Sequence, residues 1–351
     1  MTVEKTASSR KTSRRKKPVG AFVLLGALLL VLLAGITAVG YLATLSNNFD
    51  TNTKKITNAF PQESSRPAEP KPTADGKTPV NILLVGSDSR GATALEAESG
   101  SASNQRSDTM MLVHIPADRQ HVYVISIMRD LWVPIPNHGS AKVNAALAFG
   151  GVPLMVQTVE SLLGQRLDHV VFMDFEGFKG LTDAVGGVTI DVKAPFTAGQ
   201  TSDIHFNAGP QTMNGDQALA FVRERYAFAD GDYQRVRDQQ AYLKALVSKI
   251  ATPQTLTNPV TLANAVNGFS PYLTVDSSFT SEKVAALGLE LTGIRPKDIV
   301  TFTLPTSGTG WSTDGQSIVL LNQGATSALA DALAKGTMPQ YVAANNLANG
   351  N

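Results

Sequence analysis

Cysteine is absent from the 351-residue chain. Its absence excludes disulfide bonds, thiolate metal sites, iron–sulfur clusters and a cysteine nucleophile. Histidine is scarce, and the five histidines lack the spacing of metal ligands, which disfavours a histidine-based zinc site. They are His114, His121, His138, His169 and His205. A Gly-x-Ser-x-Gly elbow is also missing, which disfavours a serine hydrolase.

A phosphate-binding loop is present only in part. Residues 86–93 (GSDSRGAT) follow a predicted strand and resemble such a loop. The motif requires lysine where this chain has Ala92. The sequence therefore disfavours a nucleotide hydrolase.

Charged residues are missing between positions 18 and 49, and residues 19–45 are almost wholly apolar. A helix needs about 20 apolar residues to cross a bilayer. Seven basic side chains and one acidic one precede this segment, which predicts a cytoplasmic tail over 1–18 and an outward-facing body. A cleaved signal peptide is the alternative, but its apolar region is normally about 7–15 residues long. We therefore predict a single-pass membrane protein with a transmembrane helix over 19–45.

The rest of the chain is mildly acidic, with 23 basic and 28 acidic residues after position 18. This balance disfavours a nucleic-acid-binding body. Residues 46–79 are rich in Ser, Thr, Asn and Pro and predict a flexible extracellular linker. We expect one extracellular domain over 80–337 and a flexible tail over 338–351.

Short β-rich runs alternate with helical patterns after residue 80, which predicts an α/β domain with a mixed central sheet flanked by helices. The predicted strands are Val80–Gly86, Thr109–Ile115, His121–Ser126, His169–Phe172, Val188–Val192 and Ile299–Leu304. The predicted helices are Pro153–Leu163, Phe175–Ala184, Gly215–Val222, Tyr233–Ile250, Ser281–Leu291 and Ile318–Ala334.

Carboxylates and arginines gather at the ends of these strands and in two later segments. They are Asp88, Arg90, Arg106, Asp108, Arg129, Asp130, Arg223, Arg225, Asp232, Arg235 and Arg237. Each alone has a simple structural explanation as a turn cap, an ion pair or a solvated helix face. Together, paired carboxylates suit Mg²⁺, and several arginines suit a phosphate-bearing polyanion. The set indicates metal-assisted chemistry on a phosphate or pyrophosphate outside the membrane.

At these residues the chain resembles the LytR-CpsA-Psr family of membrane-anchored cell-wall ligases. The matching segments are NILLVGSDSR (81–90), RSDTMMLVHI (106–115), SIMRD (126–130), KVNAALAFGG (142–151), FEGFKGLTDAVGGVTIDV (175–192), MNGDQALAFVRERY (213–226) and DYQRVRDQQ (232–240). Seven segments in family order cover most of residues 80–245. One departure is Asp238, which stands where the family often has arginine before the paired glutamines.

The resemblance implies an α-β-α sandwich and a specific reaction. Such proteins transfer a glycopolymer from a polyprenyl-pyrophosphate carrier to a peptidoglycan hydroxyl and release polyprenyl phosphate. It implies that Asp88 and Asp108 hold Mg²⁺ (or Mn²⁺). It also implies a pyrophosphate-binding set of Arg90, Arg106, Arg129, Arg223, Arg225, Arg235, Gln239 and Gln240.

Catalytic roles are expected for Arg129, Asp232 and Arg235, with Asp232 or Asp130 as the base that accepts the hydroxyl proton. Two other functions remain open: an extracellular polyprenyl-pyrophosphate pyrophosphatase, and a non-catalytic prenyl-phosphate-binding scaffold or sensor. The sequence also leaves open whether the polymer is a teichoic acid, a capsule or an arabinogalactan.

Overall fold

The computed structural model describes residues 46–87, 107–199, 203–250, 266–268 and 270–350 of the chain. The predicted cytoplasmic tail (1–18) and transmembrane helix (19–45) lie outside these residues. Residues 46–351 form one compact unit. Within the described residues, helix α3 (Ala145–Leu163) is long and apolar enough to cross a bilayer. However, 61% of its apolar window is buried inside the domain, as in the core helix of a globular protein.

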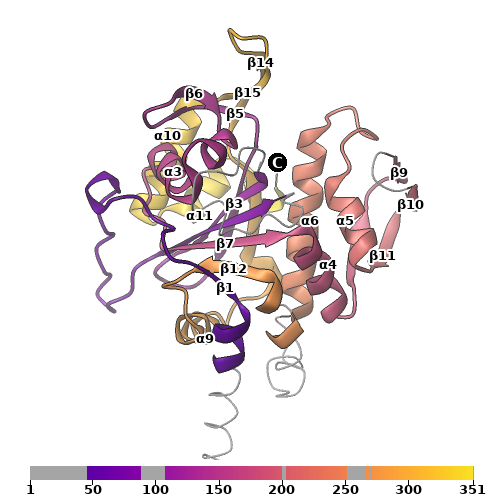
Figure 1. Cartoon of the computed structure of the whole chain (residues 1–351), viewed down its shortest axis with the longest axis horizontal. Helices are drawn as coiled ribbons and strands as arrows, with labels where there is room; N and C mark the ends of the chain where they lie inside the picture. The colour runs from indigo at the N-terminus through magenta and orange to yellow at the C-terminus, as the bar shows by residue number, and fades with distance from the viewer. Residues whose placement is uncertain (1–45, 88–106, 200–202, 251–265, 269, 351) are drawn as a thin grey trace, which may run out of the picture. The chain divides into compact units, whose positions relative to one another are not determined.

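A mixed seven-stranded sheet forms the centre of the domain (Figure 1). Its strands in spatial order are β1 (Lys54–Ile56), β12 (Leu273–Asp276), β7 (His169–Asp174), β2 (Val80–Ser87), β3 (Ser107–Ile115), β4 (Val122–Ile127) and β13 (Ile299–Thr303). Strands β2 and β7 pair in parallel, whereas β3 is antiparallel to both β2 and β4. As a result β2, β4 and β7 all end at the same edge of the sheet.

Helices cover both faces of this sheet. Successive side chains of a strand point to opposite faces, and here both faces carry apolar side chains that must be buried. The other helices are α4 (Phe175–Ala184), α5 (Gly215–Arg223), α6 (Asp232–Ile250), α9 (Ser281–Glu290), α10 (Gln323–Lys335) and α11 (Met338–Ala344). Leu83 and Val85 of β2 pack into one core with α3, α10 and α11. Ile82 and Leu84, on the opposite face, pack with residues of α9 and α6. The predicted α-β-α sandwich is confirmed.

Smaller sheets flank this sandwich. A four-stranded sheet has the order β14 (Thr306–Trp311), β15 (Ser317–Leu321), β5 (Leu131–Ile135) and β6 (Gly139–Lys142). Two antiparallel pairs join β8 (Val188–Val192) to β11 (Gly209–Met213), and β9 (Phe196–Ala198) to β10 (Ile204–Phe206). These pairs contribute to a second core that includes residues of α4, α5 and α6.

One predicted helix was wrong at its start. The sequence predicted a helix over 318–334, but residues 317–321 form β15 and the helix begins at Gln323. The side chain of Asn322 caps that helix by accepting a hydrogen bond from the Ala325 amide at 3.1 Å. The apolar run at 318–321 suits either element, and a strand results because β15 pairs with β5 and β14.

The predicted flexible linker over 46–79 was also wrong as a description of the whole segment. Residues 46–52 are helical, and residues 54–56 form β1, which pairs in parallel with β12. Phe49 and Ile56 are buried at 5% and 0% exposure. The polar composition of the segment hid these few apolar anchors, because three-residue strands carry almost no local signal.

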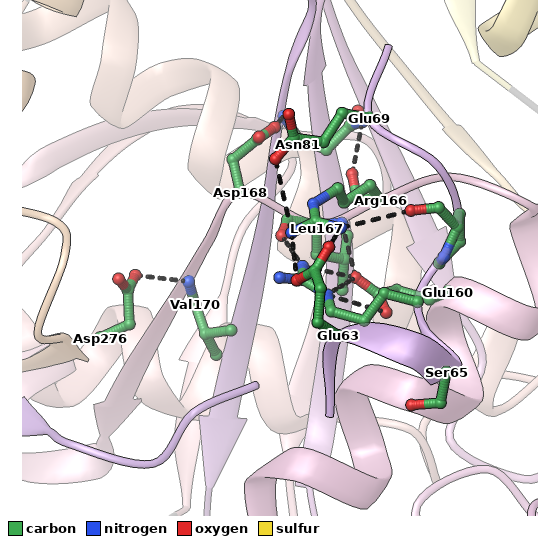
Figure 2. Close-up of polar contacts among 12 residues, drawn as sticks. Glu63, Ser65, Glu69, Asn81, Glu160, Arg166, Leu167, Asp168, Val170 and Asp276 are labelled. Carbon is green, nitrogen blue, oxygen red and sulfur yellow. Dashed lines mark hydrogen bonds and ion pairs between the residues drawn. The ribbon is translucent and has the colours of Figure 1, made fainter. Parts of the chain in front are cut away.

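Arg66 attaches the same segment to the domain core. Its guanidinium donates to Glu160 of α3, with an Nη2–Oε1 distance of 2.7 Å, and both side chains are almost fully buried. Figure 2 shows Glu160 beside the neighbouring contacts of this cluster, including the Leu167 amide that donates to it at 2.9 Å. The nearby Arg166 forms a two-pronged ion pair with Glu63, at 2.5 and 2.7 Å. These charges hold the segment in place.

The predicted flexible tail over 338–351 required a similar correction. Helix α11 occupies Met338–Ala344, followed by a short 3-10 helix, η4 (Leu347–Asn349). Met338 and Leu347 are buried at 1% and 7% exposure in the core on the α3 side of the sheet. The domain therefore extends from residue 46 to the end of the described chain.

Candidate active site

A pocket of about 360 Å³ lies at the sheet edge where β2, β4 and β7 end. Carboxyl ends of strands are a common place for ligand sites in α/β folds. Most of its wall is apolar. The apolar residues are Leu84, Val85, Met111, Val171, Met173, Phe175, Phe178, Leu181, Leu219, Val222, Tyr242, Leu243 and Leu246. They come from the sheet and from α4, α5 and α6, so the pocket lies between layers of the fold.

Four arginines line the same pocket: Arg129, Arg223, Arg225 and Arg235. Arg129 follows the end of β4, Arg223 and Arg225 lie at the end of α5, and Arg235 lies in the first turn of α6. The structure therefore brings together four of the six arginines that the sequence selected. The pocket combines an apolar interior with a concentration of positive charge.

Asp232 links three of these arginines. Its carboxylate lies 3.4 Å from Nε of Arg129, 3.5 Å from Nη1 of Arg225 and 2.9 Å from Nη2 of Arg235. Since both carboxylate oxygens take part, Asp232 fixes the relative positions of the guanidinium groups. This arrangement favours a positioning role for Asp232, and its predicted role as a base stays a prediction.

Glu224 was not predicted as a site residue, but it shapes the turn that carries the arginines. It lines the pocket and is 4% exposed. Its Oε1 accepts hydrogen bonds from the backbone amides of Arg225, Tyr226 and Ala227, at 2.9, 2.6 and 3.0 Å. The carboxylate thus holds the backbone after α5 in one shape, which orients Arg225.

Phe175 and Asp174 were also missed by the sequence reasoning, and both line the pocket. The Arg223 guanidinium lies over the Phe175 ring at 4.2 Å from its centroid, a cation–π contact. Asp174 caps α4 by accepting from the Gly177 amide at 2.7 Å. The sequence does contain one signal for Asp174: it lies between a predicted strand and a predicted helix, where an aspartate is a typical N-cap.

The two predicted glutamines have different positions. Gln239 lines the pocket and donates to the Val222 carbonyl at 3.3 Å. Gln240 is not among the lining residues and donates to Ser126 Oγ at 2.9 Å. Gln240 therefore attaches α6 to β4 in the domain interior and does not face the pocket.

Asp130, the other candidate base, lies beside the pocket. Its carboxylate is 3.6 Å from Nε of Arg129 and 3.2 Å from Nζ of Lys142. It carries fewer arginine contacts than Asp232 among the described residues. Its predicted role as a base stays a prediction.

The predicted metal ligands can be compared with the structure only in part. Asp88, Arg90 and Arg106 lie outside the described residues, and Asp108 is described only as backbone, within β3. Ser87, the last residue of β2, pairs with Ser107 of β3, the residue before Asp108. Carboxylates are a donor type that suits Mg²⁺, and the metal site at Asp88 and Asp108 stays a prediction. Among the described residues, no group of three or more Asp, Glu or His side chains forms a metal site.

Asp238 is buried close to this site at 6% exposure. Gln234 donates to its Oδ1 at 2.8 Å, and Oδ2 has no hydrogen-bond partner among the described residues. Burial raises the pKa of Asp238 to about 7, and the nearby Asp230 and Glu224 act in the same direction against Arg237. An arginine at this position, as the family often has, would add to the positive charge, whereas Asp238 is partly neutral at pH 7.

We expect Asp238→Asn to stabilise the domain above pH 7. The folded-state pKa of Asp238 is raised from 3.8 to about 7, so the folded state binds a proton more tightly than the unfolded chain. Stability is therefore lost as pH rises from about 4 through 7, by roughly a few kcal/mol. The asparagine variant avoids this loss, and urea unfolding at pH 4 to 8 measures it. If the difference in stability between Asp238→Asn and the native protein stayed constant from pH 4 to 8, the raised pKa of Asp238 would be contradicted.

The chain is similar to known proteins in both sequence and structure. A model of the LytR_cpsA_psr family matches residues 42–335. The chain is 37% identical over 235 residues to the probable cell wall biosynthesis protein LcpB of Corynebacterium glutamicum, covering 64% of this chain and 54% of the relative. It is 35% identical over 207 residues to the polyisoprenyl-teichoic acid–peptidoglycan teichoic acid transferase TagU of Bacillus mycoides, covering 58% and 64%. The chain thus spans between half and two thirds of the length of these curated relatives.

A solved structure of TagT bound to LI-WTA has a similar fold. It superposes with a TM-score of 0.60 at 26% identity, covering 78% of this chain and 97% of the solved chain. The shared part includes most of the described domain.

Proposed function

The chain belongs to the LytR-CpsA-Psr family, and from this premise we propose that it transfers a glycopolymer from a polyprenyl-pyrophosphate carrier to a hydroxyl group of peptidoglycan. The carrier is an amphipathic molecule, with a long apolar tail and a doubly charged pyrophosphate. The proposed acceptor is a polysaccharide. The reaction is a phosphoryl transfer that releases polyprenyl phosphate.

The pocket is the observation that supports this proposal most directly. Its wall is mainly apolar, and Arg129, Arg223, Arg225 and Arg235 line it together. An apolar tail is favourably buried against such a wall, and guanidinium groups match phosphate oxygens with paired hydrogen bonds. A water-soluble nucleotide or sugar phosphate would leave the apolar part of the pocket unused.

The names of the relatives agree with this substrate class. TagU is named as a transferase of polyisoprenyl-linked teichoic acid to peptidoglycan, and LcpB as a probable cell wall biosynthesis protein. We propose the same two partners for this chain, a polyprenyl-pyrophosphate-linked glycopolymer and peptidoglycan. Teichoic acid and arabinogalactan are both polymers of the proposed class.

The proposed reaction assigns separate tasks to the residues of the site. The arginines bind the two phosphates and neutralise the charge that grows on the leaving phosphate, while Asp232 and Glu224 hold Arg129, Arg225 and Arg235 in position. The acceptor hydroxyl oxygen forms a bond to the distal phosphorus, which carries the glycopolymer. The bond from this phosphorus to the bridging oxygen breaks, and polyprenyl phosphate leaves with that oxygen.

The proton of the acceptor hydroxyl passes to a carboxylate. Asp130 is our preferred acceptor, since it lies beside Arg129 and its described ion pairs involve only Arg129 and Lys142. Asp88 and Asp108 are the residues that would hold Mg²⁺ or Mn²⁺, which neutralises phosphate charge when bound. We also propose a membrane anchor over residues 19–45, with the catalytic domain outside the cell, because an anchor concentrates the enzyme beside a lipid-linked donor.

A donor assay with two tail lengths tests this proposal. We expect the full-length chain in detergent to convert a long-tailed polyprenyl-pyrophosphate donor and a peptidoglycan fragment into a phosphodiester product, with Mg²⁺ added and with EDTA as the metal-removal control. Leu219→Trp narrows the apolar pocket. We therefore expect it to raise KM for the long-tailed donor roughly tenfold over the native value, and to raise KM for a short-tailed donor much less. Leu289→Trp is the matched control, because Leu289 is 73% exposed.

The same assay separates the other two functions. Release of polyprenyl phosphate without phosphodiester product would support a pyrophosphatase. A donor that binds and stays intact under all conditions would support a non-catalytic binder. An equal effect of Leu219→Trp on both donors would contradict the assignment of the pocket to the lipid tail.

A further inference from the structure

A row of three side chains crosses the outer face of the small sheet formed by β14, β15, β5 and β6. Trp132 of β5 pairs with Lys142 of β6 on one side and with Leu320 of β15 on the other. Directly paired residues share a face of a sheet, so the indole lies between an ammonium group and an aliphatic side chain. Leu320 is 37% exposed, and its side chain covers Gly310 of β14.

The alternation along β5 identifies this face as the outer one. Leu131, Val133 and Ile135 are buried at 0%, 1% and 2% exposure and belong to the core. Trp132 is partly exposed and Pro134 is exposed. Since side chains alternate along a strand, Trp132 and Pro134 face away from the core. In Figure 1 this sheet lies at the end of the domain that carries the β14–β15 hairpin.

This outer face is continuous with the active site. Asp130 lies in the turn directly before β5, and its carboxylate is 3.2 Å from Nζ of Lys142, the cross-strand partner of Trp132. The same carboxylate is 3.6 Å from Nε of Arg129, which lines the pocket. The surface therefore begins beside the proposed reacting phosphate and leads away from it along β5.

We propose that this face, defined by Asp130, Trp132, Pro134, Lys142 and Leu320, binds the saccharide chain of the acceptor. The inference rests on the proposed transferase function and adds the acceptor side of the same site. A flat indole packs against the carbon–hydrogen face of a sugar ring, and its N–H end can bond a hydroxyl. Lys142 adds hydrogen-bond donors for hydroxyl or carboxylate groups at the edge. A sugar bound here presents its neighbour's hydroxyl to Asp130 and Arg129.

A membrane surface is the competing occupant, and the charges on the face disfavour it. Asp130 lies in the same surface as Trp132, and a carboxylate is repelled by the anionic headgroups that attract basic patches. The apolar side chains that define this face are Trp132, Pro134 and Leu320, with Lys142 in the same cross-strand row, which is a small apolar area for insertion. The pocket, lined by many apolar residues, already accounts for the lipid tail of the donor.

The two tryptophans of the chain give a direct binding test. Trp132 and Trp311 are the only tryptophans, and both lie in the small sheet. Trp311 is 76% exposed and pairs with Ser317, three positions from Leu320, so it faces the opposite side. Trp311→Phe leaves Trp132 as the only indole, and Trp132→Phe leaves Trp311 as its matched control.

We expect soluble, uncrosslinked peptidoglycan glycan fragments to change the emission of the Trp311→Phe protein, with saturation, and to leave the Trp132→Phe protein unchanged. No change in Trp132 emission would overturn the inference, even in a protein active as a transferase. A change with anionic vesicles but not with glycan would overturn it in favour of a membrane contact.

Transfer kinetics give a second, independent readout. We expect Trp132→Ala to raise KM for the acceptor about tenfold, whereas Trp311→Ala keeps the native value. An unchanged acceptor KM in Trp132→Ala, in an enzyme that transfers polymer, would contradict the inference alone. Absence of both transfer and donor cleavage in the native protein would contradict the proposed function, while the emission titration still tests saccharide binding.

Discussion

Alanine in place of Arg129 is expected to lower the rate of polyprenyl-phosphate release by roughly 10²–10³-fold, the usual loss when one fixed donor to a developing oxyanion is removed. Arg129 lines the pocket and contacts both Asp130 and Asp232. Its removal takes away a guanidinium from the reacting phosphate and also removes one ion-pair partner from each of the two carboxylates. We therefore expect the loss mainly in kcat, measured with a long-tailed donor at saturating acceptor.

Arg237→Ala is the matched control for this prediction. Arg237 belongs to the same Arg-rich segment, but it pairs with Asp230 and Gln234 and does not line the pocket. We expect its rate to stay within about twofold of the native value. Arg129→Lys keeps the charge but loses the planar guanidinium group, so its rate of polyprenyl-phosphate release should lie between those of the native and Arg129→Ala proteins. Equal rates for Arg129→Ala and Arg237→Ala would remove Arg129 from the proposed reaction.

The sequence predicted the central layers of the fold well, because their signals are local. Strands β2, β3, β4 and β8 alternate or concentrate branched apolar residues, and α4 has helical spacing with an aspartate at its N-cap. The predicted bounds of β8 and α4 agree with the structure. Each of these elements contains enough residues for its own period to be visible.

Other elements escaped prediction because their stability comes from distant partners. Strand β1 has three residues and exists by pairing with β12, more than 200 residues later. The helix-like run at 318–321 becomes β15 because β5 and β14 supply hydrogen bonds on both sides. No local pattern reports such contacts, so composition alone suggested a loose linker and a longer helix.

The candidate site was predictable in its charges but not in its geometry. The resemblance selected Arg129, Arg223, Arg225 and Arg235, and the structure brings these four to one pocket. The sequence predicted the helix that becomes α6, but it did not indicate that space remains between this helix and the sheet. Only the folded chain reveals that Asp232 joins three arginines and that Gln240 faces the interior.

The buried pair of Arg66 and Glu160 leads to the largest expected effect on stability. Glu160 is 1% exposed and receives hydrogen bonds from Arg66 and from the Leu167 amide. Arg66 also donates to the Leu167 carbonyl and lies over the Phe60 ring, at 4.5 Å from its centroid. Removing either partner leaves a charge in the interior without compensation.

We expect Glu160→Ala and Arg66→Ala each to lower the free energy of unfolding by about 3–5 kcal/mol, the usual loss when one partner of a buried ion pair is removed. Urea unfolding at pH 7 measures it. The double variant Arg66→Met/Glu160→Met should recover much of the loss, because it leaves no charge buried. Asp331→Ala, which breaks an exposed pair with Lys335, should cost less than about 1 kcal/mol.

The same pair distinguishes the two possible starts of the domain. A chain that begins at Val80, the boundary that composition suggested, keeps Glu160 but lacks Arg66 and β1. The shorter chain therefore combines an unpaired buried carboxylate with an uncovered sheet edge at β12. We expect it to unfold at a lower urea concentration than the Arg66→Ala variant of the chain that begins at residue 46. If the shorter chain were as stable as the longer one, residues 46–79 would be a linker after all.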